Sequence, residues 1–286
     1  MKRILFIITV FVIFLGAFST QAGEEKVESF CPAVFSKIRI LLVPGHNNEE
    51  WGAQYGNLKE SYMNLAVAVR VYNLLKKDER FEVFITRDED GYLTEFSDYF
   101  NIEKDNIILF KEDARNEIWI KILNGTFIQK VNPPHNTASS SASLRLYGIN
   151  KWANENKIDA VINMHFNDYK RKNKWTIGKY RGFVIYMPEE QMANSKKSVN
   201  LAENIFLELN KKYSVSNYIE EKKGIVPDQK LIALGVNNTL NETVRSVVIE
   251  YGYIYEKIFR NSFTRHKSYE TFAELTVKGI ANSFFE

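Results

Sequence analysis

Short apolar runs alternate along the chain with longer segments whose apolar residues recur at helical spacing. An apolar run of about four to eight residues bounded by turn residues predicts a buried strand, and helical spacing predicts a helix with one face in the core. The predicted strands cover 38–43, 81–86, 159–166, 182–187 and 246–250, and the predicted helices cover 60–76, 112–123, 144–156, 195–213 and 269–284. This alternation indicates an α/β fold of three αβα layers around a mostly parallel twisted central sheet.

Residues 95–143 do not fit the alternation. They contain the predicted helix at 112–123, a break at Pro133-Pro134 and three consecutive serines at 139–141. Unstructured connections longer than about 12–15 residues are uncommon in compact domains and are often functional. We interpret 95–143 as an insertion in a single domain that spans 38–286.

The N-terminal residues have another pattern. Met1-Lys2-Arg3 precedes an apolar run over 4–18 and small or polar residues over 19–23. A basic start, about 7–15 apolar residues and a small-residue exit are typical of a secretory signal peptide, whereas a membrane span needs roughly 20 apolar residues. We expect a signal peptide over 1–22 and a linker over 23–37, with an uncleaved anchor as the alternative. Export to the periplasm or the extracellular cell wall would follow, without stable membrane association after cleavage.

Charge and cysteine content narrow the classes of partner. The formal net charge is +3, and two of the positive charges, Lys2 and Arg3, lie in the predicted signal peptide. A nearly neutral mature chain has no strong electrostatic attraction to nucleic acid, so we expect no nucleic-acid partner. Cys31 is the only cysteine, which excludes an intramolecular disulfide. We expect a monomer.

Side chains suited to metal binding or proton transfer lie at the ends of predicted elements. His46 follows the first strand, Glu60 opens a helix, and His165 and Glu250 end two later strands. The carboxyl ends of parallel strands meet at one edge of an open α/β sheet, where ligands bind. Two imidazoles and a carboxylate can hold Zn²⁺ with a position left for water, and a further carboxylate can act as general base. We therefore hypothesise a hydrolytic zinc site.

Each of these residues taken alone also has a structural interpretation. A histidine after a strand more often makes a structural hydrogen bond, and Glu60 at a helix start interacts favourably with the helix dipole. Glu250 is harder to explain in this way, because a carboxylate there is costly to bury unless it is paired or bound to a metal. His135, in the insertion, is interpreted as a loop residue, and His266 as an exposed one.

Four segments together resemble the zinc-dependent N-acetylmuramoyl-L-alanine amidases of the bacterial cell wall, the Amidase_3 type. Residues 40–46 are similar to the strand that ends in Pro-Gly-His in that family, and Glu60 with 64–66 is similar to its Glu-x-x-x-Asn-Leu helix start. Residues 163–167 resemble its Ser-Ile-His-Ala-Asn run, and 248–254 resemble its Glu-x-Gly-Phe signature. Thr86-Arg87 also falls where the family has Thr-Arg after its second strand.

The resemblance implies a reaction and roles for the site residues. His46, Glu60 and His165 would be the Zn²⁺ ligands, and Glu250 the catalytic glutamate. The substrate would be peptidoglycan, hydrolysed at the amide between the lactyl group of N-acetylmuramic acid and the L-alanine of the stem peptide. Some family members have an inserted helix that covers the zinc site until a protein activator displaces it. Glu112 and Glu117 lie on a candidate for such a helix, for which a surface elaboration or a substrate subsite is the alternative.

The chain departs from the family pattern at several positions. Asn47-Asn48 replace the glycines usual after Pro-Gly-His, Asn163 replaces a serine, and Ile149 stands where the family has an arginine, with Arg145 one helical turn earlier. These departures concern the fit of the substrate more than metal binding. Two other functions stay open at this point: a zinc peptidase or other amidohydrolase on the same scaffold, and a non-catalytic cell-wall-binding module.

Overall fold

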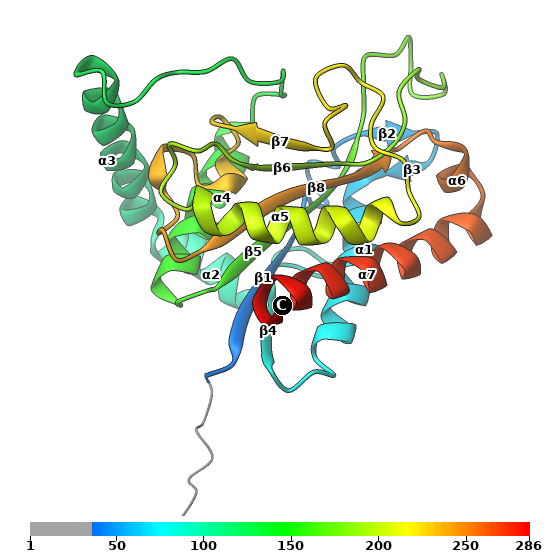
Figure 1. The fold of residues 1–286 in the computed structure, drawn as a ribbon, viewed down its shortest axis with the longest axis horizontal. Helices are drawn as coiled ribbons and strands as arrows, with labels where there is room; N and C mark the ends of the chain where they lie inside the picture. Colours follow the sequence, from blue (N-terminus) through cyan, green and yellow to red (C-terminus); the bar gives the residue numbers. More distant parts are fainter. Residues whose placement is uncertain (1–35) are drawn as a thin grey trace, which may run out of the picture. The chain divides into compact units, whose positions relative to one another are not determined.

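The apolar runs form the central sheet. A computed structural model describes residues 36–286, so the predicted signal peptide, Cys31 and most of the predicted linker lie outside the described residues. The main sheet has six strands in the order β4-β1-β5-β8-β6-β7 (Figure 1). Their bounds are β1 Ile38–Pro44, β4 Phe81–Ile85, β5 Ala160–Asn167, β6 Val184–Pro188, β7 Ile225–Asp228 and β8 Arg245–Tyr253.

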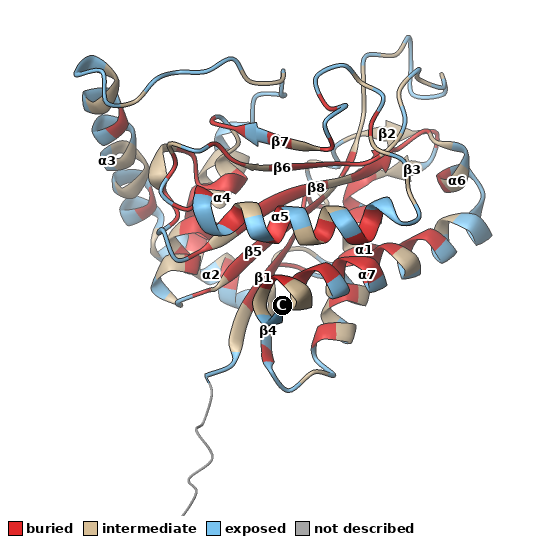
Figure 2. Ribbon diagram, viewed as in Figure 1, coloured by how far each residue is buried: buried red, intermediate tan, exposed pale blue. Residues whose placement is uncertain are grey.

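Most strands of the sheet are parallel, as predicted. β4, β1, β5 and β8 run in one direction, β6 pairs antiparallel with β8, and β7 pairs parallel with β6. β1, β5, β6 and β8 are buried along most of their length (Figure 2), which explains their nearly continuous apolar runs. Because β4, β1, β5 and β8 share a direction, their carboxyl ends lie at one edge of the sheet.

Helices cover both faces of the sheet and confirm the three-layer architecture. One face packs against α1 (Glu60–Leu75), α5 (Ser195–Asn210) and α7 (Ser262–Phe285), and the other against α2 (Thr94–Ile102), α3 (Lys104–Leu123) and α4 (Ser140–Glu155). Val67, Ile205 and Phe272 are fully buried in the first core, and Phe96 and Trp152 are buried in the second. Figure 1 shows α5 and α7 side by side across the first face.

The segment interpreted as an insertion is more ordered than its sequence predicts. The predicted helix at 112–123 is the second half of α3, and α2 was not predicted. Phe96 and Phe100 of α2 are buried beside α4, so this part of the segment belongs to the second helical layer. The chain between α3 and α4 has no regular secondary structure. We call its residues 128–139 the strap.

Several short elements were also not predicted from the sequence. The hairpin of β2 (Gln54–Tyr55) and β3 (Leu58–Lys59) directly precedes α1, and α6 (Lys257–Arg260) precedes α7. β7 and the 3₁₀ turns η1 (Ile232–Leu234) and η2 (Val236–Asn238) lie in a region with no clear periodicity. Among residues 36–286, no helix has the length and apolar character to cross a membrane.

A substitution at Gly279 tests how closely α5 and α7 pack. A Cβ atom at this position would lie 2.5 Å from Ile205 Cα and 2.8 Å from Ile205 N, which belong to the backbone of α5. Gly279→Ala should lower the free energy of unfolding, because overpacking costs about 1–3 kcal/mol and the gain in helix propensity is only about 1 kcal/mol. Urea denaturation measures the change. Lys278→Ala, at the exposed neighbouring position, should stay within about 0.5 kcal/mol of the wild type; equal effects of the two variants would contradict the close packing.

Candidate active site

Three side chains from different elements converge at the carboxyl edge of the sheet. His46 Nε2 lies 3.2 Å from Glu60 Oε2, and His165 Nδ1 lies 2.9 Å from Glu60 Oε1. One potential ligand atom from each residue lies within 4.8 Å of the other two. His46 follows β1, Glu60 opens α1 and His165 lies near the end of β5, so the parallel strands and the first turn of α1 assemble the cluster.

The turn after β1 is held in a strained conformation. His46 has a φ of 60°, in the left-handed region that costs a non-glycine residue about 1–2 kcal/mol. Buried Arg87 fixes this turn, since its guanidinium donates to the carbonyls of Pro44 and Gly45, each at 3.0 Å. Asn64 Nδ2 also donates to Gly45 O, at 2.9 Å. These bonds orient His46 before any ligand binds.

Arg87 joins the same turn to α1. Its Nη2 donates to Ser61 O at 2.7 Å, so one guanidinium links the turn after β1 with the helix start that carries Glu60. Burial lowers the pKa of Arg87 to about 10, which leaves it charged at neutral pH. The sequence pointed to Arg87 only through its match to the Thr-Arg position of the family, without a role.

Two glycines leave the space that the cluster needs. A Cβ atom at Gly45 would overlap the imidazole of His165. At Gly52, which has a φ of +68°, it would overlap the carboxylate of Glu60 and the imidazole of His46. Any side chain at either position would therefore displace a member of the cluster.

The electrostatics of the cluster favour an ionised carboxylate between the imidazoles. Burial opposes ionisation of Glu60, but His46 and His165 outweigh it and lower the pKa of this carboxyl. Burial lowers the pKa of His46, and Glu60 outweighs this effect and raises it. Ala53 N donates to Glu60 Oε2 at 2.8 Å and Phe166 N to Oε1 at 3.3 Å, so the carboxylate is also oriented by the backbone.

These residues suit a divalent metal. Imidazole nitrogens and a carboxylate oxygen are the ligands of a His₂-carboxylate site, which leaves a further position open. The side chain of His46 is 33% exposed and that of His165 is 23% exposed, so the cluster is reachable from solvent. The carboxylate already supplies a negative charge that a cation would neutralise.

Glu250 lies beside the cluster in a contrasting environment. It pairs in register with His165 across β5 and β8. Its Oε2 is enclosed and has no hydrogen-bond partner among residues 36–286. Burial, with the nearby negative charges of Glu60 and Glu221, raises the pKa of the Glu250 carboxyl well above its ordinary value. A raised pKa makes the ionised carboxylate a stronger proton acceptor, as a general base requires.

A cavity of about 70 Å³ adjoins Glu250. It is bordered by residues from five parts of the chain, among them His135, Asn167, Tyr186, Glu221, Glu250 and Tyr253. Glu221 is buried and accepts hydrogen bonds from Tyr186 Oη at 2.9 Å and Tyr253 Oη at 2.7 Å. No sequence motif pointed to Glu221, because its partners are distant in the chain.

The four residues singled out by the sequence thus lie together, and the departures from the family pattern have structural explanations. The side chain of Asn47 accepts from the backbone N–H groups of Glu49 and Glu50 and closes the turn after His46. Arg145 reaches this turn from α4, with Nη2 2.9 Å from Glu49 Oε2. Asn163 is buried and donates to backbone carbonyls, which is a structural role.

The helix proposed to cover the site does not do so in this structure. Glu112 and Glu117 of α3 form ion pairs with basic residues of the same helix. Figure 1 places α3 and the hairpin that precedes Glu60 on opposite sides of the molecule. His266 is exposed as predicted, whereas His135 lies in a loop but borders the cavity beside Glu250.

Comparison with known proteins decides the family. The sequence model described as N-acetylmuramoyl-L-alanine amidase, Amidase_3, matches residues 40–282. The chain belongs to this family. It is therefore an N-acetylmuramoyl-L-alanine amidase, and the expected fold and enzyme class are confirmed. A search of curated proteins found no match.

Solved amidase structures share the fold of this amidase. The CwlD amidase from Clostridioides difficile, in complex with the GerS lipoprotein, is 17% identical with a TM-score of 0.55, over 87% of this chain and 98% of that one. Ami1 from Mycobacterium abscessus is 14% identical with a TM-score of 0.55, over 87% and 99% of the two chains. AmiC2 of Nostoc punctiforme is 15% identical with a TM-score of 0.52, over 88% and 99%.

Glu250→Gln should stabilise the metal-free protein, and the gain should depend on pH. The raised pKa means that folding opposes ionisation of Glu250, so the penalty appears as pH rises above the unfolded value near 4.5 and grows toward the folded pKa. The variant should have the higher urea midpoint at pH 8, and the difference should shrink toward pH 4.5. Glu274→Gln, at an exposed position of α7, is the control without such a trend. A pH-independent difference for Glu250→Gln would contradict this interpretation.

Proposed function

We propose that this amidase is an exported, zinc-dependent peptidoglycan hydrolase that cleaves the amide between N-acetylmuramic acid and L-alanine of the stem peptide. The observation that carries the proposal is the convergence of His46 Nε2, the Glu60 carboxylate and His165 Nδ1 next to Glu250. Two imidazoles and one carboxylate are the ligands that hydrolytic zinc sites use. The predicted signal peptide over 1–22 supports export to the periplasm or the cell wall, where the substrate lies.

The residues of this site would have two different roles in hydrolysis. His46, Glu60 and His165 would hold the metal, which, when bound, polarises the scissile carbonyl and lowers the pKa of the attacking water. The Glu250 carboxylate would accept a proton from that water and pass it to the leaving nitrogen of L-alanine. Burial and the charges of Glu60 and Glu221 raise the pKa of this carboxyl, which makes the ionised group a stronger proton acceptor.

Digestion of purified peptidoglycan by zinc-loaded protein that lacks residues 1–22 tests the reaction. Mass spectrometry should find intact stem peptides with a free L-alanine amine. A chelator should abolish their release and added Zn²⁺ should restore it. Cleavage within the stem peptide would indicate a zinc peptidase on the same scaffold. Wall binding without any cleavage would favour a binding module. Since one similar structure is a complex with a lipoprotein, folded and zinc-bound but inactive protein would next be tested for a protein activator.

Variants of the cluster separate metal binding from proton transfer. Glu250→Gln should keep zinc and lose about 10²–10⁴-fold in kcat, the usual contribution of a general base. His165→Ala should lose both zinc and cleavage. His266→Ala, which removes an exposed histidine outside the cluster, should keep both. Zinc content by atomic absorption and kcat with the same peptidoglycan are the two measurements. Normal turnover by Glu250→Gln would exclude Glu250 as the base.

A further inference from the structure

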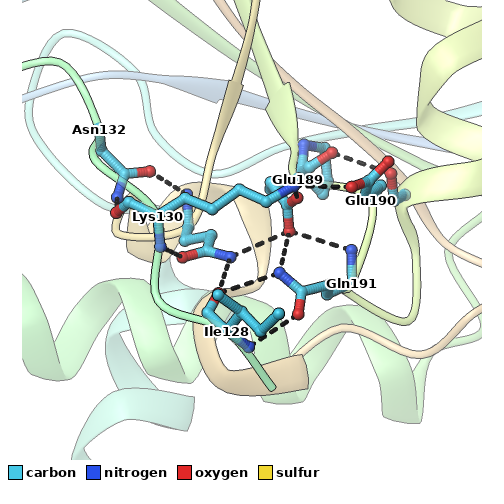
Figure 3. A network of polar contacts seen from close by, with 9 residues as sticks. Ile128, Lys130, Asn132, Glu189, Glu190 and Gln191 are labelled. Carbon is cyan, nitrogen blue, oxygen red and sulfur yellow. Dashed lines mark hydrogen bonds and ion pairs between the residues drawn. The ribbon is translucent and has the colours of Figure 1, made fainter. Parts of the chain in front are cut away.

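The strap is fastened to the far strands of the sheet at its first residues. Ile128 and the Gln191 side-chain amide exchange two hydrogen bonds, of 2.8 and 3.0 Å (Figure 3). Lys130 N donates to Gln229 Oε1 at 2.8 Å, and Lys130 Nζ lies 2.5 Å from Glu189 Oε1. These contacts join the strap to the residues that follow β6 and β7.

The other end of the strap reaches the turn that carries His46. Ser139 Oγ donates to Glu50 Oε1 at 2.5 Å. Glu50 in turn accepts the backbone N–H of Asn47 at 3.1 Å. The strap is therefore anchored on both sides of the active-site edge. Its middle residues, Pro134 and His135, border the cavity beside Glu250.

His135 is held in one orientation by a buried acid. His135 Nε2 lies 2.8 Å from Asp228 Oδ2 at the end of β7, and Asp228 has no exposed surface. Asp228 Oδ1 accepts from Lys230 N at 2.7 Å and Leu231 N at 2.9 Å, which fixes the carboxylate. The imidazole also contacts the ring of Tyr186 edge-on, with centroids 5.2 Å apart.

This arrangement selects the tautomer of the neutral imidazole. An ionised carboxylate only accepts hydrogen bonds, so Nε2 of His135 carries the hydrogen and Nδ1 remains an acceptor. Nδ1 has no protein partner in the part of the chain that the structure describes. The nearby hydroxyls of Tyr186 and Tyr253 are already used as donors to Glu221. Toward a ligand, the cavity thus offers mainly acceptors, which suit the N–H groups of a peptide.

We propose that His135 is a substrate-positioning residue, whose Nδ1 accepts a hydrogen bond from an N–H group of the stem peptide in the cavity shared with Glu250. This inference rests on the proposed function. Asp228 sets the tautomer and the ring orientation, and the strap brings the imidazole to the active-site edge. Proton transfer stays with Glu250.

Two amide variants of different reach distinguish this role from simple fastening of the strap. An asparagine amide reaches the position of the imidazole Nδ1, whereas a glutamine amide reaches that of Nε2. His135→Asn keeps an acceptor in the cavity but loses the bond to Asp228, and His135→Gln does the reverse. With zinc-loaded enzyme and N-acetylmuramoyl-L-alanyl-D-isoglutamine, His135→Gln and His135→Ala should raise KM about tenfold, the effect of one lost hydrogen bond. His135→Asn should stay within about threefold of wild type.

The opposite order of KM values in the two amide variants would overturn the proposal. If His135→Gln matches wild type while His135→Asn behaves like His135→Ala, the histidine only fastens the strap, and wild-type KM in all three variants excludes any role. Lys130→Met, which removes another strap contact away from the cavity, should leave KM within about twofold. An equal rise in KM for Lys130→Met would also show that the effect comes from loosening the strap.

A wild-type enzyme that does not cleave this peptide would instead count against the proposed function. His135 is then tested by ¹⁵N NMR of the histidine-labelled Glu250→Gln variant, with His135→Ala in the same background to assign the signals. The same peptide should shift the Nδ1 resonance while Nε2 keeps its hydrogen. No shift at saturating peptide would overturn the assignment of His135.

Discussion

The active site depends on one buried carboxylate that is held between two imidazoles. Glu60 is almost completely buried, and an unpaired charge at such a position would be costly. His46, His165 and two backbone N–H groups compensate it. To place these partners around Glu60, β1 and β5 must end at the same edge, and the turn after β1 must adopt a left-handed conformation at His46. The guanidinium of Arg87 supports both this turn and the start of α1.

Glu250, a short distance away, has the same functional group as Glu60 in an environment that shifts its pKa in the opposite direction. Its Oε2 has no compensating cation or hydrogen-bond donor among the described residues. The negative charges of two other carboxylates add to the effect of burial and raise its pKa further. One glutamate is therefore kept ionised and the other is driven toward the protonated form. Paired titratable groups whose environments move their pKa values apart are typical of acid–base sites. Here the difference arises from which elements surround each side chain, because the residue type is the same.

The region between β4 and α4 combines two kinds of structure. Its first half is part of the fold, since α2 and the start of α3 bury Phe96, Phe100 and Ile107 in the second core. Its second half is the strap, which is held by side-chain amides, ion pairs and serine hydroxyls with little apolar burial. Polar fastening of this kind can hold a chain segment at the active-site edge without adding to the core, and it brings His135 next to Glu250.

The sequence by itself determined the elements with strong periodicity and the four residues at their ends. β1, β5 and β8 were predicted because a buried parallel strand needs a continuous apolar run, and His46, Glu60, His165 and Glu250 followed from their positions at strand and helix termini. Only the tertiary structure decided the contacts of Arg87, Glu221 and His135. His135 and Asp228 are 93 residues apart, and neither lies in a periodic segment. A local sequence pattern indicates which face of an element is buried. The contact between His135 and Asp228 is not visible in such a pattern, because it forms only when the topology brings β7 and the strap together.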